Sequence, residues 1–445
     1  MLKRDLHIAL FLCCISCIAF AQNFDLPKDQ KYEKVKFQLV NNVMVIPIEV
    51  NGTALSFILD SGVSTPLLFN LTEQDSIQIN KVSEITIRGL GEGEPIQALS
   101  SRSNSFKIGA AQNQNQELYV VLDQALNLSP SLGIPIHGII GYDLFRDFVV
   151  EINYNSKHIK FHNPELYHDK QHKKSQTLSL AIRNKKAYVK GAIVLNDSEE
   201  IPVRMLLDTG SSDAIWLFEN ETIGVPTKNY DDFLGRGLAG NIYGKRTKIN
   251  SIKIGDFVIK DAKTAFPDRA SFGAIKSLGN RNGSLGGEVL KRFNFVFDYA
   301  NNKITLRKNG NFKEPFHYNL SGIDLQHNGV RYISESIAGA NGIVRNKDSE
   351  TFGNVQILME NQTRLSLVPE IIVSGIRAGS PAADAGLLEG DVILAVNGKS
   401  VHTYKLQQIL QMLNERKGKR IKVLIERQND DKVITFVLKD VFKKP

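Results

Sequence analysis

Short apolar runs and segments of alternating apolar and polar residues follow one another along most of the chain. Residues 35–50 alternate around Asn41-Asn42, a pattern that predicts two strands joined by a hairpin turn. The continuous apolar run Phe57-Ile58-Leu59 predicts a buried strand, and Asp60-Ser61-Gly62 directly after it predicts a sharp turn. The pattern therefore predicts a mainly β protein that holds a carboxylate at the tip of a buried strand.

The same order of elements occurs twice. Residues 35–163 run from alternating strands through the Asp60 turn to a closing pair of strands, and residues 178–308 repeat this order around Asp208-Thr209-Gly210. Arg88 follows Asp60 at the same spacing as Arg236 follows Asp208. Such a duplication predicts two like lobes joined by a linker at 164–177. A pseudo-twofold axis between the lobes would bring the two turns face to face.

Two carboxylates in contact cannot both ionise cheaply, so they share a proton. One then serves as a base that activates water, and the other as an acid that protonates a carbonyl oxygen. Asp60 and Asp208 are therefore the candidate catalytic residues. The Ser211 hydroxyl is placed to bond Asp208, whereas Val63 at the equivalent place cannot, so Asp208 is expected to ionise more readily. The residues expected to support the pair are Ser61, Gly62, Thr209, Gly210 and Ser211.

These paired turns resemble the aspartic proteases of the pepsin and retropepsin class. Because its lobes are short and contain no cysteine, the chain resembles exported bacterial retropepsin-like enzymes more than pepsin itself. The resemblance implies two β-barrel lobes, hydrolysis of peptide bonds by water held between two aspartates, no cofactor, and hydroxyl bonds from Ser61 and Thr209 across the axis. It also places substrate-covering flaps at two glycine-rich segments, for which ordinary hairpins are the alternative. The flap residues are Arg88, Gly89, Leu90, Gly91, Arg236, Gly237, Leu238 and Gly240.

Residues 312–440 follow another pattern. Gly379-Ser380-Pro381-Ala382-Ala383 and, shortly after it, Gly390-Asp391-Val392-Ile393 resemble a PDZ domain, with an amphipathic helix at 404–414. The resemblance implies that Leu320, Ser321, Gly322 and Ile323 form the loop that binds a peptide C-terminus through backbone N–H groups. It also implies an insertion at about 326–368.

The first 21 residues have the features of a secretory signal peptide. Lys3 and Arg4 precede an apolar stretch that ends at Ala19-Phe20-Ala21, which predicts a mature chain from Gln22 with a polar leader to residue 34. All three cysteines lie in this segment, and a lipoprotein signal at Cys17 fits less well. We expect export to the periplasm or the cell surface, with membrane attachment only if the chain is lipidated.

Charge and histidine spacing argue against nucleic-acid binding and against a metal site. The net charge of +8 comes without a long basic block, so no nucleic-acid binding is expected. The histidines show no metal-ligand spacing, so no metal site is expected, and His137 and Trp216 are interpreted as structural. The expected partners are a protein or peptide substrate and a C-terminal peptide for the PDZ domain. The alternative is a non-catalytic peptide-binding protein built on degenerate lobes, which Ser61 and Val63 favour.

Overall fold

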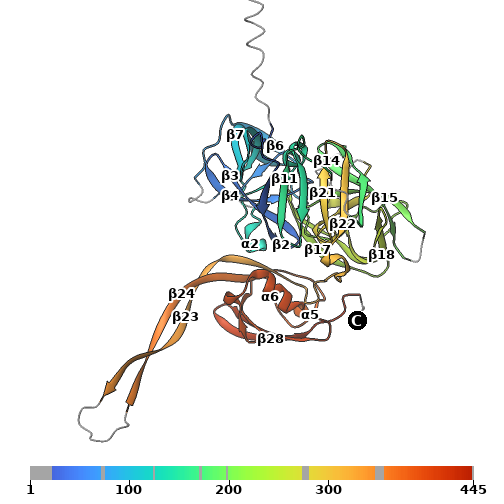
Figure 1. Cartoon of the computed structure of the whole chain (residues 1–445). Coiled ribbons are helices and arrows are strands. Elements are labelled where there is room, and N and C mark those ends of the chain that lie inside the picture. Colours follow the sequence, from blue (N-terminus) through green and yellow to red (C-terminus); the bar gives the residue numbers. More distant parts are fainter. Residues whose placement is uncertain are drawn as a thin grey trace, which may run out of the picture. The chain divides into compact units, whose positions relative to one another are not determined.

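The computed structural model describes residues 23–71, 76–123, 126–169, 173–196, 199–272, 280–345 and 355–442. The predicted signal peptide, its cleavage site and Cys17 lie outside the described residues, so those expectations stay predictions. The chain divides into two compact units. The second unit comprises Ser129–Gly133 and Asn319–Asp440, and the first comprises the remainder of the chain (Figure 1). The two units are taken separately below.

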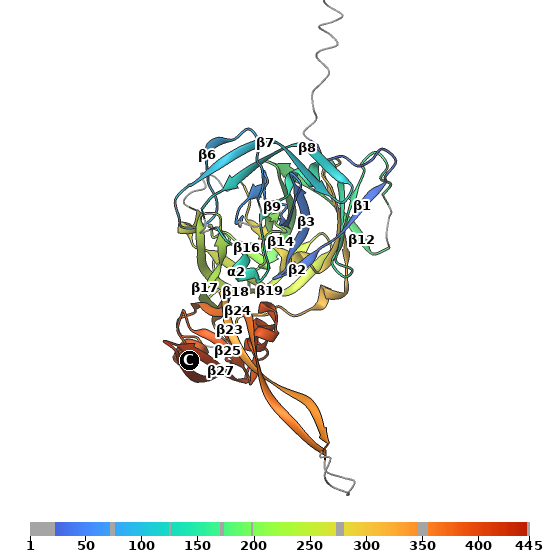
Figure 2. The same cartoon turned by 90° about the vertical axis from the view of Figure 1, so that its left-hand side faces the viewer.

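The first lobe is built on one sheet of eight strands. Across the sheet their order is β2-β3-β4-β9-β5-β8-β7-β6. A further pairing of β3 with β7 connects the sheet back on itself, so that the strands from β3 to β7 form a closed ring (Figure 2). The strands are β2 (Gln38–Val40), β3 (Val43–Val50), β4 (Thr53–Leu59), β5 (Leu67–Leu68), β6 (Ser83–Ile87), β7 (Ile96–Ile108), β8 (Ala111–Val121) and β9 (Gly138–Ile140).

The second lobe repeats this sheet strand for strand. Its order is β13-β14-β15-β20-β16-β19-β18-β17, and pairing of β14 with β18 closes the ring. The prediction of a mainly β chain with two like lobes is therefore confirmed. The strands are β13 (Ala181–Arg183), β14 (Lys186–Val194), β15 (Ile201–Leu207), β16 (Ile215–Leu217), β17 (Asn229–Gly237), β18 (Gly240–Ile254), β19 (Phe257–Pro267) and β20 (Gly283–Leu285).

A third sheet, of six strands, joins the two lobes. At its centre β10 of the first lobe pairs antiparallel with β21 of the second, and Glu151 stands opposite Val296. These two residues hold equivalent places in the repeats, so the pseudo-twofold axis passes between them. The strands in order are β1 (Tyr32–Lys36), β11 (His158–His162), β10 (Val149–Asn153), β21 (Phe293–Asp298), β22 (Lys303–Lys308) and β12 (Ser175–Ser179).

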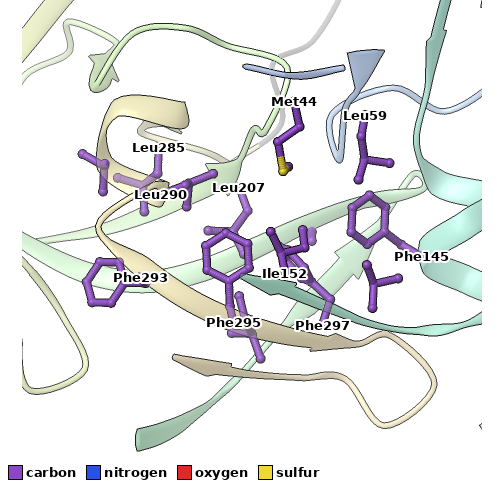
Figure 3. Packing of buried hydrophobic residues seen from close by; sticks show 14 of the residues in the cluster. Met44, Leu59, Phe145, Ile152, Leu207, Leu285, Leu290, Phe293, Phe295 and Phe297 are labelled. Carbon is purple, nitrogen blue, oxygen red and sulfur yellow. The ribbon is translucent and has the colours of Figure 1, made fainter. Parts of the chain in front are cut away.

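One hydrophobic core continues through both lobes beneath the two turns. Leu59 and Leu207, the last residues of β4 and β15, belong to the same buried cluster as Phe145, Phe295 and Phe297 (Figure 3). Burying one such side chain stabilises the fold by about 1.5–3 kcal/mol. The two aspartates that follow Leu59 and Leu207 are thus attached to strand ends that are buried in this core.

Local sequence explains how the repeats close. Asn41 and Asn42 have φ of 45° and 66°, and Asn184 and Lys185 have φ of 48° and 63°, so each lobe starts with the left-handed turn that asparagine tolerates. Short helices complete the first unit: α3 (Tyr142–Asp147), α4 (Gly287–Leu290) and 3-10 helices at Arg269–Phe272 and Gly310–Lys313. Within the described ranges, no helix is long and apolar enough to cross a membrane.

The second unit contains one sheet and two principal helices around its own core. The sheet order is β23-β24-β25-β27-β28, with β26 beside β25. Leu325, Val373, Ile409 and Ile425 lie in its buried cluster. The elements are β23 (Ile323–Arg345), β24 (Val355–Ile376), α5 (Pro381–Asp384), β25 (Val392–Val396), β26 (Lys399–Ser400), a 3-10 helix (Val401–Thr403), α6 (Leu406–Leu413), β27 (Arg420–Arg427) and β28 (Asp430–Val437), with α2 (Ser129–Leu132) also assigned to this unit.

The predicted insertion at about 326–368 continues two strands of this sheet. β23 and β24 pair along their length and extend as a hairpin beyond the rest of their unit (Figure 2). Residues 346–354 of this insertion lie outside the described part of the chain. The insertion therefore lengthens an existing hairpin of the sheet.

Candidate active site

The two candidate catalytic residues stand at equivalent strand ends. The Asp60 N–H donates to the Ile140 carbonyl at 2.8 Å, and the Asp208 N–H donates to the Leu285 carbonyl at 3.0 Å. Both acceptors belong to the short parallel strands β9 and β20 beside β4 and β15. Each turn is thereby fixed to two strands of a closed sheet, which restricts its motion.

Reciprocal hydrogen bonds hold the two turns together across the axis. The Ser61 N–H donates to Thr209 Oγ1 at 2.9 Å, and the Thr209 N–H donates to Ser61 Oγ at 3.1 Å. The Ser61 hydroxyl donates to the Leu207 carbonyl at 2.7 Å, and the Thr209 hydroxyl to the Leu59 carbonyl at 2.8 Å. Both side chains are fully buried. Serine at position 61 therefore makes the same bonds as threonine at 209.

The carboxyl groups of Asp60 and Asp208 are hydrogen-bonded to each other. Each also accepts one backbone N–H: Gly62 donates to Asp60 Oδ1 at 2.6 Å, and Ser211 donates to Asp208 Oδ1 at 3.0 Å. A Cβ on Gly210 would lie 2.5 Å from Oδ2 of Asp60, so only glycine leaves room for the pair there. Ser211 thus supports Asp208 through its amide rather than through the hydroxyl expected from the sequence.

Burial and mutual repulsion set the ionisation of this pair. Burial, together with the charge of Asp208, raises the pKa of Asp60 to about 7. Burial also raises the pKa of Asp208, but the positive charges of Arg281 and Lys186 oppose the increase. The shared proton therefore resides on Asp60, and Asp208 is the ionised member. Tyr299, whose pKa is raised chiefly by burial, also faces Asp60 and stays neutral.

Lys186 and Arg281 are functional candidates that the sequence patterns did not reveal. Lys186 is the first residue of β14 and follows the hairpin turn at Asn184 and Lys185. The Ser64 hydroxyl of the first lobe donates to the Asn184 carbonyl of this turn at 3.4 Å. The Arg281 guanidinium lies 5.1 Å from the centre of the Phe218 ring. Burial lowers the pKa of both cations.

The first lobe has apolar residues at both equivalent places. Val43 begins β3 as Lys186 begins β14, and Ile136 precedes His137 as Arg281 precedes Asn282. His137 and Asn282 are matched by their bonds, since each accepts a strand N–H on its side chain, from Ser56 at 3.0 Å and from Arg204 at 2.8 Å. Aligning the two repeats would have singled out the cations, but not their position beside the carboxyl pair.

The two predicted flap segments meet each other. The Ala239 N–H donates to the Leu90 carbonyl at 2.9 Å, and the Gly93 N–H donates to the Ala239 carbonyl at 2.6 Å. The Gly91 N–H donates to the Ser271 backbone carbonyl at 2.9 Å. Leu90 also packs against Leu234, which is buried in the second lobe. In the described part of the chain these hairpin tips bond to each other, and no bond joins them to the carboxyl pair.

A cavity of about 910 Å³ lies beside the meeting tips. Its lining comes from β6, residues 93–95, the start of β7, the tip 236–240, and Leu122, Asp123 and Leu126. It includes the predicted flap residues Arg236, Gly237, Leu238 and Gly240. Asp60 and Asp208 do not line it. Arg88 and Gly89 belong to the loop after β6, where a Cβ on Gly89 would collide with the Leu238 side chain.

His137 and Trp216 have structural surroundings. The His137 ring accepts the Ser56 N–H, and the Trp216 indole N–H donates to Asp213 Oδ2 at 3.0 Å. Over the described ranges, no three side chains of His, Cys, Asp or Glu are grouped so that they could hold a metal ion.

The predicted carboxylate-binding loop of the second unit is buried and internally bonded. Ser321, Gly322 and Ile323 all lie in the interior. Their N–H groups donate to Asn414 Oδ1 at 2.9 Å, to Asn319 Oδ1 at 2.9 Å and to Ser321 Oγ at 3.3 Å. Leu320 packs against the core of its unit. The three amides on which the prediction of carboxylate capture depends are therefore already occupied.

Closed duplicated lobes with a hydrogen-bonded aspartate pair at their junction define the class of bilobal aspartic proteases. Comparison with known families agrees with this class: residues 46–144 and residues 189–289 each match the aspartyl protease family, and residues 372–427 match the PDZ domain family. The chain thus carries two aspartyl protease segments, one in each lobe, followed by a C-terminal PDZ domain. Domains of both kinds bind peptides.

A solved structure gives a more distant likeness. The crystal structure of an aspartic proteinase from Irpex lacteus is 12% identical in sequence and has a TM-score of 0.38. The match covers 64% of this chain and 99% of that one.

Proposed function

We propose that the protein is an aspartic endopeptidase in which Asp60 and Asp208 activate one water molecule. The observation that carries the proposal is the hydrogen-bonded carboxyl pair, fixed at the junction of the lobes by the Ser61 and Thr209 hydroxyls. A pair of structural turn acids would gain nothing from such contact, because burying two carboxyl groups together raises the pKa of both.

The proposed reaction uses the unequal ionisation of the pair. The Asp208 carboxylate accepts a proton from water as the water oxygen attacks the carbonyl carbon of the substrate, while Asp60 donates its proton to the carbonyl oxygen. The tetrahedral intermediate then collapses: the Asp60 carboxylate takes a proton from one hydroxyl group of the intermediate, and the C–N bond breaks as the leaving nitrogen takes the proton held by Asp208. Neither aspartate alone supplies both an acid and a base, so both are required.

The substrate is expected to be an extended polypeptide. Backbone hydrogen bonds of the kind that join strands would hold it, and side chains would give the preference for particular sequences. The hairpin tips at Leu90 and Ala239, which bond to each other, are the segments proposed to open when a long chain enters.

The test is proteolysis of a denatured protein by the wild type and by Asp60→Asn, Asp208→Asn and the double variant. Each single variant should lose cleavage, and the double variant should be little worse, since residues that act as a unit are strongly non-additive. Pepstatin should inhibit the wild type. All three variants should melt cooperatively, because Asn keeps the shape of Asp.

Cleavage that survives in either single variant would reject the paired mechanism. Wild-type protein that binds denatured chains without cutting them at any pH would instead support the non-catalytic peptide-binding alternative. Loss of folding in both single variants would indicate that the two turns are structural.

We also propose that the protein is exported, on the basis of the charged and apolar pattern of residues 1–21. Mass spectrometry of the protein from the envelope or medium should find a mature chain that starts at Gln22. A lipid-modified chain that starts at Cys17 would establish the alternative anchor, and an uncut chain in the cytoplasm would contradict export.

A further inference from the structure

The long hairpin of β23 and β24 has an exposed apolar face. Residues that stand directly opposite each other in an antiparallel pair share one face of the ribbon. Three such pairs follow one another along this hairpin: Val330 with Pro369, Tyr332 with Leu367, and Ser334 with Leu365 (Figure 2). The large side chains among them are mostly exposed, Val330 at 65%, Tyr332 at 72%, Leu365 at 69% and Leu367 at 58%. These four side chains are called the arm face below.

The other face of the same ribbon is turned toward its own unit. Arg331 and Ile333 alternate with the residues of the arm face along β23, and both are half-buried. Arg331 Nη2 donates to Glu426 Oε2 of β27 at 2.8 Å. The arm face is therefore the side of the ribbon that points away from β27.

The ribbon that carries the arm face has only two strands. Ile372 pairs with Val392, and in the described chain this is the only pairing of β24 with β25. From there β23 and β24 continue as a pair to Arg345 and Val355. A two-stranded hairpin is marginally stable in water unless a third strand or a packed apolar face supports it. The arm face is thus expected to be covered for as long as the protein is folded.

The chemistry of this side of the ribbon favours a protein partner over a lipid surface. Its described positions are all uncharged: Val330, Tyr332, Ser334, Thr363, Leu365, Leu367 and Pro369. Segments that lie on membranes usually combine apolar side chains with Lys and Arg. Apolar, uncharged faces are instead typical of the contacts between identical subunits.

The exposed area fits a contact between two copies of the chain. The arm face exposes roughly 500 Å² of mostly apolar surface, toward the upper end of what a monomer leaves uncovered. Two arm faces packed together would bury about 1,000 Å², which is the lower limit of a specific interface. A twofold axis lets one surface serve as its own complement. A second copy is also always present, whereas a substrate is not. We propose that the arm faces of two copies pack against each other about a twofold axis and make the protein a homodimer.

Sedimentation velocity of the purified protein from about 0.1 to 50 μM tests the proposal. The expected result is an equilibrium of monomer and dimer with Kd on the order of micromolar, as suits a small interface. Tyr332→Ser/Leu367→Ser should weaken association at least about tenfold, because apolar area is lost from both copies. Leu388→Ser/Val433→Ser is the matched control. These two side chains of the same unit are 52% and 55% exposed but lie outside the ribbon, so dimerisation should be unchanged.

Three outcomes of this experiment would overturn the proposal. The first is a wild-type protein that stays monomeric over the whole range. The second is a dimer that Tyr332→Ser/Leu367→Ser does not weaken. The third is equal weakening by the control pair, which would show that association does not depend on the arm face.

Photo-crosslinking identifies the cover directly and does not depend on the variants. A benzophenone side chain replaces Tyr332, and unlabelled protein is mixed with isotope-labelled protein. We expect links that join one labelled and one unlabelled peptide, with residues 330–334 or 363–369 in the linked partner. Links confined to a single chain, or links to added phosphatidylglycerol vesicles in place of protein, would overturn the proposal. No readout here requires cleavage, so the result is independent of the proposed protease activity.

Discussion

The two cations beside the carboxyl pair come from the second lobe alone. Arg281 acts on Asp208, and Lys186 acts on both aspartates, so Asp208 receives more stabilisation of its charged form. The sequence suggested the same inequality through the Ser211 hydroxyl, whereas in the structure the two cations provide it. The two turns make equivalent hydrogen bonds but differ in charge environment, and this difference is the basis for the acid and base roles in the proposed mechanism.

Cleavage should follow a bell-shaped pH profile. Asp60 must be protonated to act as the acid, so activity should fall as the pH rises through about 7, the pKa of Asp60. At low pH, activity should fall as Asp208 becomes protonated, because Asp208 must be ionised to act as the base; this fall is the acid limb of the profile. Arg281→Met should move the acid limb to higher pH by roughly half a unit to one unit, and Lys186→Met should move both limbs upward.

Lys185→Met is the matched control for these profiles. Lys185 is exposed in the same hairpin and lies 5.5 Å from the centre of the Tyr142 ring, and its charge acts on Asp143. Its removal should leave both limbs in place. An acid limb that does not move in Arg281→Met would show that the guanidinium has no influence on the pair.

Asp60→Asn should stabilise the protein at neutral pH. Because the pKa of Asp60 is raised in the folded state, the folded protein binds more protons than the unfolded chain between about pH 4 and pH 7. Wild-type stability is therefore lost as the pH rises through this window. The difference in unfolding free energy between variant and wild type should grow from near zero at pH 4 to on the order of a few kcal/mol above pH 7. Denaturant titrations at several pH values measure it, and a difference independent of pH would contradict the assigned pKa.

At the scale of elements, two hairpin tips, one from each lobe, contact each other. The loop after β6 and the turn between β17 and β18 exchange two backbone bonds, through Leu90, Gly93 and Ala239. Their strands are long and well paired, but the contact between the tips depends on these few bonds. The tips are therefore expected to open without disturbing either closed sheet.

Gly93→Ala should hold the tips apart. A Cβ on Gly93 would lie 2.5 Å from the Ala239 carbonyl oxygen, so the two loops must separate to admit it. We expect faster hydrogen exchange at residues 88–93 and 237–241, and a several-fold decrease in kcat/KM with little change in Tm. Gly224→Ala is the control, because its Cβ would meet nothing within 4 Å. Unchanged exchange in Gly93→Ala would refute the contact between the tips.

Alternating and apolar patterns were sufficient to predict the duplication and the strands that carry the two turns. Phe57–Leu59 and Met205–Leu207 form buried strands as expected, since a short apolar run that ends at a turn is typical of a buried strand. Closure through β3 and β7 was not predictable, because it depends on register between distant strands. The positions of Arg281 and Asn414 were missed for a similar reason: each acts on residues far away in the sequence.

At the scale of the whole first unit, the two lobes share a sheet and a core. β10 pairs with β21, and Phe145, Phe295 and Phe297 belong to one buried cluster. Most buried apolar side chains of the two lobes form one continuous cluster. The lobes are therefore expected to fold as one cooperative body.

Separating the lobes should abolish folding. Residues 22–163 produced alone would expose the faces of β10 and α3 that pack on the second lobe, so we expect an aggregated or unfolded fragment. Producing residues 22–169 together with residues 170–445 should restore a soluble complex with one melting transition. A fragment 22–163 that is monomeric and melts cooperatively would contradict the shared core.

The pairing of Glu151 with Val296 has an evolutionary consequence. When a strand pairs with its own equivalent about a twofold axis, a single lobe could have used the same contact to associate with an identical copy of itself. In such a homodimer, every group near the axis must occur twice. Joining both copies in one gene removes that restriction, so Lys186 and Arg281 could appear on one side while Val43 and Ile136 stayed on the other. Covalent fusion thus allows two identical half-sites to become one acid and one base.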